Sequence, residues 1–319
     1  MTHVVNLALI QFRPTKGDLR GNLARVTDAF SRVTTLSPRP DVVTFPETAL
    51  SGYFLEGGVR DVACSAQAFA NALNDAYTAG LAQAAHGAHD GVANGSHASI
   101  DVVAGFYELY ENTYYNSALY ATLGGDAGQV VHVHRKVFLP TYGMFDEERF
   151  VDHGLDVRAF NTRWGRAAMI VCEDAWHSVT AMTAALDGAQ IIFVPSASPA
   201  RGAWPSPEPD DDEAIAPASL HRWERLVRDR AEEHGVYVAV TQLVGNEGGK
   251  AFAGGSVVAG PHGEIRTRGP LWDEAILPVS LDLHDITRAR ADTPLLSDLR
   301  ALLPHMLRAL ERTIANDEP

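Results

Sequence analysis

The sequence predicts an α/β fold, and three observations support this. Short apolar runs alternate along the chain with longer stretches of helical periodicity, a pattern typical of alternating strands and helices. Several runs are continuously apolar, as expected for strands that are covered on both faces. The composition, 46% hydrophobic and 21% charged, is that of a globular chain able to bury a large core.

Eight apolar runs are predicted as strands, and three longer stretches as helices. The strands cover residues 4–11, 42–45, 101–108, 114–121, 167–171, 191–194, 236–243 and 255–259. The helices cover residues 22–34, 64–85 and 219–234. Gly235 follows the last of them, at the position where a helix often stops.

After Asp282 the chain continues into a tail with an apolar stripe at helical spacing. The stripe consists of Leu302, Leu303, Met306, Leu307, Leu310 and Ile314. A lone helix with such a stripe must pack on its own core or on a partner subunit. We therefore expect residues 1–285 to form one large domain and residues 286–319 a C-terminal helical extension.

Two stretches interrupt the alternation and are predicted to be loops. Residues 86–99 are rich in Gly, Ala, His and Asn, and the spacing of their histidines matches no compact ligand motif. We therefore predict no metal site. Residues 205–213 read PSPEPDDDE, which fits either a solvated loop or a mobile lid near an active site.

Charge and cysteine content exclude several classes of protein. The chain has 26 basic and 40 acidic residues, and a net charge of −14 argues against nucleic acid or an anionic membrane as its main partner. Two cysteines, Cys64 and Cys172, are too few for a disulfide framework and favour a reducing compartment. The N-terminal residues lack the features of a signal peptide, and no apolar run has the roughly 18 residues that span a bilayer. We expect a cytoplasmic protein.

Three side chains that could act in catalysis each follow a predicted strand. Glu47 comes just after residues 42–45, Lys136 follows an alternating apolar segment, and Cys172 ends the run 167–171. Taken singly, each residue has an ordinary interpretation: a capping or salt-bridge carboxylate, a surface lysine, and an inert buried cysteine.

Together, the three residues and the motifs around them resemble the nitrilase or carbon–nitrogen hydrolase superfamily. The motifs are Phe-Pro-Glu at Glu47, Arg-Lys-x-x-Leu-Pro at Lys136 and Cys-Glu-Asp-x-Trp at Cys172. The resemblance extends from residue 8 to about residue 282. It implies a four-layer α-β-β-α sandwich of two mixed β-sheets, with residues 1–285 as the hydrolase domain. It also implies a homodimer or higher homo-oligomer built by helix contacts, and no metal or organic cofactor.

The resemblance also implies a mechanism for cleaving a small amide. Glu47 would take the thiol proton of Cys172, and the ammonium of Lys136 would favour the thiolate. Lys136 and the backbone N–H of Glu173 would stabilise the oxyanion that forms when sulfur attacks the carbonyl. Glu47 would then protonate the departing amine and activate water to hydrolyse the thioester.

Further residues are predicted to support the reaction or to bind substrate. Counting back from Gly154 in the family pattern selects Glu147 rather than Glu148 as a second glutamate that orients Lys136 and contacts substrate. The alternative is a surface acidic pair. The candidate pocket residues, which could equally be ordinary core or rim residues, are Tyr53, Tyr142, Ser196, Ser198 and Trp204.

Within the superfamily, residues 172–176 and 194–199 look most like the glutaminase domain of glutamine-dependent NAD synthetase. The 319 residues contain no Ser-Gly-Gly-x-Asp phosphate-binding loop, so we expect a free-standing amidohydrolase that acts on a linear amide or a carbamoyl amide. Three alternatives remain. The chain could be a glutaminase subunit that supplies ammonia to a separate synthetase, a binding relative that has lost catalysis, or a nitrile hydrolase.

Overall fold

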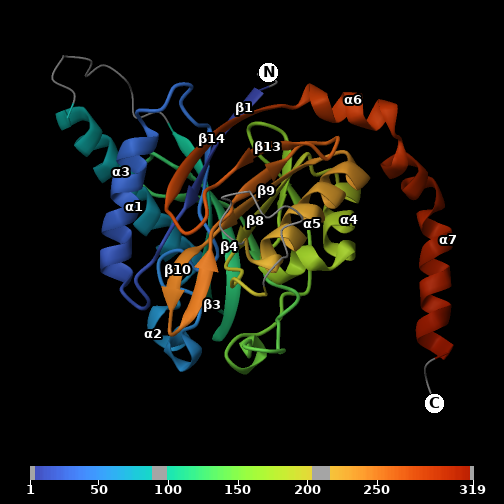
Figure 1. Cartoon of the computed structure of the whole chain (residues 1–319), viewed down its shortest axis with the longest axis horizontal. Coiled ribbons are helices and arrows are strands. Elements are labelled where there is room, and N and C mark those ends of the chain that lie inside the picture. Colours follow the sequence, from blue (N-terminus) through green and yellow to red (C-terminus); the bar gives the residue numbers. More distant parts are fainter. Residues whose placement is uncertain (1–3, 88–98, 203–215, 317–319) are drawn as a thin grey trace, which may run out of the picture.

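The structure, a computed structural model, describes residues 4–87, 99–202 and 216–316. Two six-stranded β-sheets pack face to face, and helices lie on the outer side of each sheet (Figure 1). Each sheet contains both parallel and antiparallel strand pairs. The predicted α-β-β-α sandwich of two mixed sheets is therefore confirmed.

The first sheet has the strand order β14-β1-β2-β3-β4-β5. β1 and β2 are parallel, as are β2 and β3, and the other neighbours are antiparallel. The strands are β1 (Val4–Gln11), β2 (Val42–Thr44), β3 (Ile100–Tyr110), β4 (Thr113–Leu123), β5 (Gln129–Arg135) and β14 (Ala275–Asp282).

The second sheet repeats this pattern, with the order β13-β12-β9-β8-β7-β6 and a parallel centre of β7, β8 and β9. Its strands are β6 (Ala159–Asn161), β7 (Arg166–Met169), β8 (Ile191–Ser196), β9 (Tyr237–Gln242), β12 (Val257–Ala259) and β13 (Ile265–Arg268). A separate hairpin pairs β10 (Val244–Glu247) with β11 (Lys250–Ala253).

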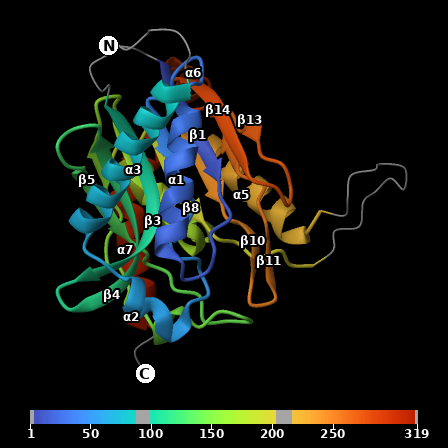
Figure 2. The same ribbon diagram turned by 90° about the vertical axis from the view of Figure 1, so that its left-hand side faces the viewer.

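The helices form the two outer layers. α1 (Leu19–Val33) and α3 (Ala66–Gly87) lie side by side over the first sheet (Figure 2). α4 (Ser178–Leu186) and α5 (Ala218–His234) cover the second sheet. The short α2 (Val59–Val62) and three 3-10 turns complete the sandwich: η1 (Glu56–Gly58), η2 (Glu147–Arg149) and η3 (Cys172–Trp176).

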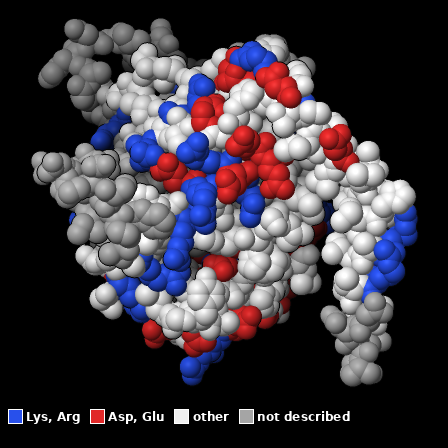
Figure 3. Space-filling model, turned by 45° about the vertical axis from the view of Figure 1, so that its right-hand side comes forward, with Lys and Arg blue, Asp and Glu red and all other residues white. Residues whose placement is uncertain are grey.

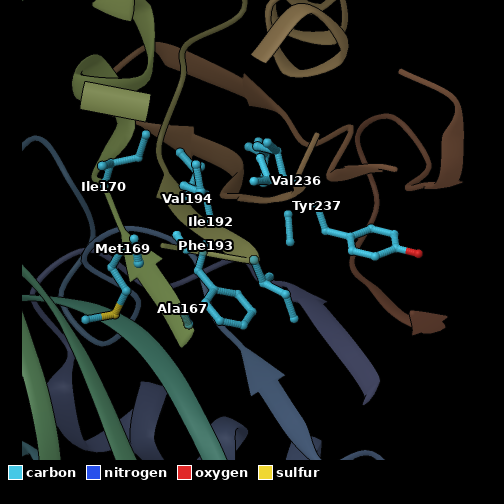
Figure 4. Packing of buried hydrophobic residues seen from close by; sticks show 14 of the residues in the cluster. Ala167, Met169, Ile170, Ile192, Phe193, Val194, Val236 and Tyr237 are labelled. Carbon is cyan, nitrogen blue, oxygen red and sulfur yellow. The ribbon is translucent and has the colours of Figure 1, made fainter. Parts of the chain in front are cut away.

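The continuously apolar strands have both faces buried, which explains their composition. In β1, Leu7 and Leu9 face the second sheet, whereas Ala8 and Ile10 pack under α1 and α3. In β8, Phe193 points toward the first sheet beside Met169, and Val194 points the other way (Figure 4). Each buried side chain of this size contributes about 1.5–3 kcal/mol of transfer free energy.

The C-terminal helices α6 (His284–Asp292) and α7 (Leu295–Asn316) leave the sandwich. Leu296, in the first turn of α7, is buried in the core. Further along, the predicted stripe is exposed at Leu302, Met306, Leu307, Leu310 and Ile314. In Figure 3 this part of α7 is an arm beside the body, with its basic side chains gathered along one edge. Only the first turns therefore pack on the core of the same chain, and the homodimer and the domain division at residue 285 stay predictions.

The eight predicted strands do not include β5, β6, β10, β11, β13 or β14, and the predicted helices do not include α2, α4 or α6; β5 was recognised only as the alternating segment before Lys136. The missed strands include the edges of both sheets, β14 and β5 in one and β13 and β6 in the other. An edge strand leaves side chains exposed, so it is not a continuous apolar run; β5, for example, has exposed and half-buried residues along most of its length. The strands at the centres of the sheets are buried on both faces, so they form the continuous apolar runs that the sequence analysis identified.

Some sequence-based expectations fall outside the described residues. They concern the acidic segment 205–213 and most of the predicted loop 86–99. Within the ranges that the structure does describe, no helix is long and apolar enough to cross a membrane.

Candidate active site

The three predicted catalytic side chains lie between the ends of strands from both sheets. Glu47 follows β2, Lys136 follows β5 and Cys172 follows β7. Lys136 Nζ donates to Glu47 Oε1 at 2.9 Å. Glu47 Oε2 accepts the backbone N–H of Ala197 at 2.8 Å, while Ser196 Oγ lies 3.3 Å from Cys172 Sγ. The residues at the end of β8 thus contact both the carboxylate and the thiol, and all three predicted side chains are buried.

Glu47 is held in a tight turn against β3. A Cβ atom added at Gly105 of β3 would lie 2.5 Å from Glu47 Cα, so only glycine allows the turn to approach the strand this closely. The N–H of Gly105 donates to Pro46 O at 3.1 Å. Thr48 has a φ of 48°, a left-handed conformation that is uncommon outside glycine. Asn116 Nδ2 donates to Glu47 Oε1 at 2.7 Å and orients the carboxylate.

Lys136 contacts a second carboxylate, that of Glu147. Lys136 Nζ lies 2.7 Å from Glu147 Oε1, and the hydroxyl of Tyr53 also donates to this oxygen. Glu147 Oε2 is buried and has no hydrogen-bond partner among the described residues. The neighbouring Glu148 is instead half exposed and pairs with His153 at 3.2 Å. The acidic pair therefore separates into one buried glutamate at the site and one surface glutamate.

Two buried carboxylates share a single buried ammonium. Burial opposes the charge of Lys136, but Glu147 and Glu47 together outweigh it and hold the pKa of the lysine well above its ordinary value. Burial raises the pKa of Glu147 from 4.5 to about 7; Lys136 opposes this shift and Glu47 adds to it. Burial beside these carboxylates also raises the pKa of Tyr53, which remains a hydrogen-bond donor.

Cys172 combines a strained backbone with a protonated side chain. Its φ is 44° at the start of η3, and a left-handed non-glycine residue costs on the order of 1 kcal/mol or more. Burial and the charge of Glu47 raise the pKa of its thiol, while Lys136 lowers it. The resting side chain is therefore a thiol that needs a base to become nucleophilic. Cys64 lies elsewhere, half-buried beside β3, and burial raises its pKa to about 11.

Asp174 connects the segments that carry Lys136 and Cys172, a role that the sequence analysis missed. Its carboxylate accepts four hydrogen bonds at 2.8–3.0 Å, from the backbone N–H groups of Val137, Phe138 and Val171 and from His134 Nε2. Three of these donors belong to the Lys136 segment and one to the Cys172 segment. The available signal was the second acidic residue in the Cys-Glu-Asp motif.

Three of the five predicted pocket residues lie close to Cys172. Tyr53 and Ser198 line a cavity of about 50 Å³ that reaches Cys172. Ser196 is fully buried with its hydroxyl against the sulfur, so it contacts the nucleophile from the protein side. A larger cavity of about 270 Å³ lies beyond Tyr53, against Glu147.

The other two predicted pocket residues are Tyr142 and Trp204. Tyr142 is 50% exposed, and its hydroxyl lies 3.1 Å from each carboxylate oxygen of Glu173. Tyr142 is therefore linked to the site by its contact with Glu173, the residue that follows the nucleophile. Trp204 lies outside the described residues.

On the face shown in Figure 3, acidic and basic side chains are intermixed and do not form a patch of one sign.

Across residues 4–87, 99–202 and 216–316, no group of three or more His, Cys, Asp or Glu side chains is placed to hold a metal ion. A reaction without a metal or organic cofactor stays a prediction.

The raised pKa of Glu147 predicts a specific dependence of stability on pH. Between pH 4.5 and about 7 the folded protein holds a proton that the unfolded chain has released. The free energy of unfolding should therefore fall as pH rises through this window. We expect Glu147→Gln to remove this fall in urea unfolding curves, because one carboxylate would then face one ammonium. Glu148→Gln is the matched control and should keep it. An unchanged slope in Glu147→Gln would mean that another group takes up the proton.

Comparison with known proteins gives a family match and several relatives of similar sequence. The sequence profile of the family described as Carbon-nitrogen hydrolase matches residues 6–291. A glutamine-dependent NAD(+) synthetase of Aquifex aeolicus is 28% identical over 289 residues, which are 90% of this chain and 44% of that protein. The chain thus spans less than half the length of this relative.

Two solved structures show the same fold. A carbon-nitrogen hydrolase from Helicobacter pylori G27 has a TM-score of 0.73 and 22% identity, covering 94% of this chain and 99% of that one. An amidase from Nesterenkonia sp. AN1 has a TM-score of 0.65 and 24% identity, covering 94% and 95%. In that amidase structure, the acetamide moiety of fluoroacetamide is covalently added at the active-site cysteine.

Proposed function

Because the chain belongs to the carbon–nitrogen hydrolase family, we propose that it is an amidohydrolase with Cys172 as its nucleophile. It would cleave a small non-peptide amide, either a linear amide or a carbamoyl amide, through a thioester. The supporting observation is a strained cysteine that lines a cavity and lies beside a buried Glu47–Lys136–Glu147 cluster. Strained backbone and shifted pKa values are typical of functional sites.

The first half of the reaction forms the thioester. Glu47 takes the proton from Cys172 Sγ, and the sulfur attacks the carbonyl carbon of the amide. Negative charge then develops on the carbonyl oxygen. The ammonium of Lys136 stabilises it together with the backbone N–H of Glu173, which lies in the first turn of η3, where amides lack partners within the helix.

The second half releases the products. The tetrahedral intermediate collapses, the C–N bond breaks, and Glu47 gives its proton to the nitrogen, which leaves as ammonia or an amine. Water then attacks the thioester while Glu47 takes its proton. The C–S bond breaks, the carboxylic acid departs, and the proton returns to the sulfur.

Glu147 has two roles in this proposal. Oε1 holds Lys136 in place, with the hydroxyl of Tyr53 fixing the same oxygen. Oε2 has no partner among the described residues and is available to accept an N–H of the substrate amide. This contact would favour primary amides and carbamoyl groups, whose NH₂ can donate.

The test is ammonia release from a panel of short amides and carbamoyl compounds, with peptide mass spectrometry of the protein after rapid acid quench and digestion. We expect release from at least one compound and a mass increase equal to its acyl group on the peptide that contains Cys172. If every compound is inert and no acyl group is trapped, the proposal fails. The chain would then be better described as a binding relative without catalysis.

A second candidate is a glutaminase subunit that supplies ammonia to a separate synthetase. The similarity to NAD(+) synthetases, of which this chain covers 44%, favours it. Glutamine turnover that rises when a synthetase partner is added would support this function. Glutamine that is neither hydrolysed nor able to acylate Cys172 would exclude it.

A further inference from the structure

Glu247 is a buried carboxylate that the proposed reaction does not use. It is the last residue of β10, in the β10–β11 hairpin, which is separate from both six-stranded sheets. The hairpin turns at Gly248 and Gly249, whose φ values of 55° and 82° suit a tight two-residue turn. Glu247 is nevertheless only 2% exposed, so its side chain points into the protein. A buried carboxylate is costly unless it is hydrogen-bonded, and Glu247 has specific partners.

The partners of Glu247 are backbone N–H groups in the segment that follows Glu47. The N–H groups of Tyr53 and Phe54 both donate to Glu247 Oε2 at 2.9 Å, across 194 and 193 residues of sequence. A Cβ atom added at Gly52 would lie 2.8 Å from Glu247 Oε1, so a glycine in front of Tyr53 allows this close approach. Burial raises the pKa of Glu247, and its two N–H donors oppose the shift.

The hairpin also holds the aromatic ring of Tyr53. Phe252 of β11 packs edge-on against this ring with centroids 6.4 Å apart, and Phe145 packs in the same way at 6.2 Å. On the other side, the hydroxyl of Tyr107 donates to the carbonyl oxygen of Tyr53 at 2.6 Å. Backbone and ring are thus both fixed, which determines where the phenol hydroxyl points.

That hydroxyl belongs to the hydrogen-bond network of the active site. It donates to Glu147 Oε1, the same oxygen that accepts Lys136 Nζ at 2.7 Å. Lys136 Nζ in turn donates to Glu47 Oε1 at 2.9 Å. Within the described residues, the hydrogen bonds of Glu247 go to the backbone of Tyr53 and its neighbour, so Glu247 is connected to Lys136 through Tyr53.

We propose that Glu247 is a positioning residue of the active site, which holds the backbone of Tyr53 so that the phenol orients Glu147. Glu147 then places the ammonium of Lys136 where the oxyanion forms. Displacing a catalytic group by about 1 Å can cost about 100-fold in rate. Because Glu247 acts on a group that stabilises the transition state, its loss should lower kcat and leave KM almost unchanged. This inference rests on the proposed amidohydrolase function.

The first test replaces Glu247 and measures kcat and KM for an amide that the wild-type protein hydrolyses. Glu247→Met removes both acceptor oxygens at similar side-chain length, and we expect kcat to fall about 10-fold or more and KM to change less than about threefold. Glu247→Gln keeps one oxygen, which can accept both N–H groups as Oε2 does, and should retain kcat within about threefold. If Glu247→Met does not fold, Glu247→Asp withdraws the carboxylate by one methylene and should lower kcat by about threefold or more.

Val244→Ala is the control for a purely structural effect. Val244 is fully buried on the same strand, so its truncation should lower the thermal midpoint while the contacts of Glu247 remain. We expect its kcat to stay within about threefold of the wild-type value. Full kcat in Glu247→Met, or an equal loss of kcat in Val244→Ala, would overturn the proposal.

A double variant tests whether Glu247 acts through the phenol. Tyr53→Phe removes the hydroxyl but keeps the backbone N–H that donates to Glu247. In the Tyr53→Phe background, Glu247→Met should lower kcat by less than about threefold, although it should lower the thermal midpoint as much as it does alone. Losses of kcat that multiply in the double variant would contradict an action through Tyr53.

A further measurement does not depend on turnover. Iodoacetamide alkylates Cys172 at a rate that peptide mass spectrometry can follow as a function of pH. Lys136 lowers the pKa of this thiol, so a displaced ammonium should shift the alkylation profile to higher pH in Glu247→Met and in Tyr53→Phe, and not in Glu247→Gln. Alkylation of Cys64 is the internal reference and should not change. This shift without turnover of any amide would support the role of Glu247 while contradicting the proposed function. An unshifted profile in Glu247→Met would overturn that role even if amides are hydrolysed.

Discussion

Replacing Cys172 with alanine is expected to reduce amide hydrolysis by about 10⁴-fold or more, because no other group near the cavity can form the thioester. The substitution shortens the side chain of a residue that is 8% exposed, and the lost sulfur makes one side-chain contact at hydrogen-bond distance, with Ser196 Oγ. The fold should therefore survive. Ammonia release gives the activity, and the far-ultraviolet circular dichroism spectrum and the thermal midpoint show whether the fold is retained.

Cys64→Ala is the matched control for this experiment. Cys64 is the other cysteine of the chain, and burial raises its pKa to about 11, so it is a poor nucleophile at neutral pH. We expect this variant to keep its activity within about twofold, as for a substitution away from the reacting atoms. Full activity in Cys172→Ala, or equal losses in both variants, would contradict the assignment of the nucleophile.

Replacing Lys136 with methionine is expected to destabilise the protein and also to inactivate it. Lys136 is fully buried and lies 2.9 Å from Glu47 and 2.7 Å from Glu147. Without the ammonium, two buried carboxylates face each other with no cation between them. Removal of one partner from a buried ion pair typically costs about 3–5 kcal/mol. Urea unfolding at neutral pH measures the loss of free energy, and ammonia release measures the loss of activity.

A double variant separates lost charge compensation from lost packing. Lys136→Met/Glu147→Gln removes one of the two unpaired carboxylates, so part of the lost stability should return, while activity should not. Lys16→Met replaces an exposed lysine and should change the free energy of unfolding by less than about 0.5 kcal/mol. If the double variant loses more free energy of unfolding than the two single variants lose together, unpaired charge is not the cause of the destabilisation.

The candidate site shows which kinds of residue a sequence can identify. Glu47, Lys136 and Cys172 were found because each lies in a recognisable motif after an apolar run. Asp174 was missed although it belongs to one of those motifs, because three of its four donors lie 36 to 40 residues earlier in the sequence. A carboxylate that organises backbone segments has no distinctive neighbours in the sequence.

Two arginines that line the cavity at Cys172 could not be placed there from the sequence, for a related reason. Arg201 follows β8 and Arg222 lies on α5, and each resembles an ordinary surface cation when the sequence is read linearly. Only packing places both of them in the cavity that reaches Cys172. The unpartnered Nε1–H of Trp223 is likewise invisible in the sequence, where Trp223 is one apolar residue on the buried face of a helix.

The sequence by itself determined the class of fold, the central strands, three main helices and the three motif residues. These features depend on local patterns: apolar runs, helical periodicity and residues at fixed places beside them. The tertiary structure alone decided the edge strands, the burial and raised pKa of Glu147, and the set of residues that line the cavity at Cys172. The physical reason is that burial and electrostatic interaction depend on which distant segments meet, and in this protein those segments come from two different sheets.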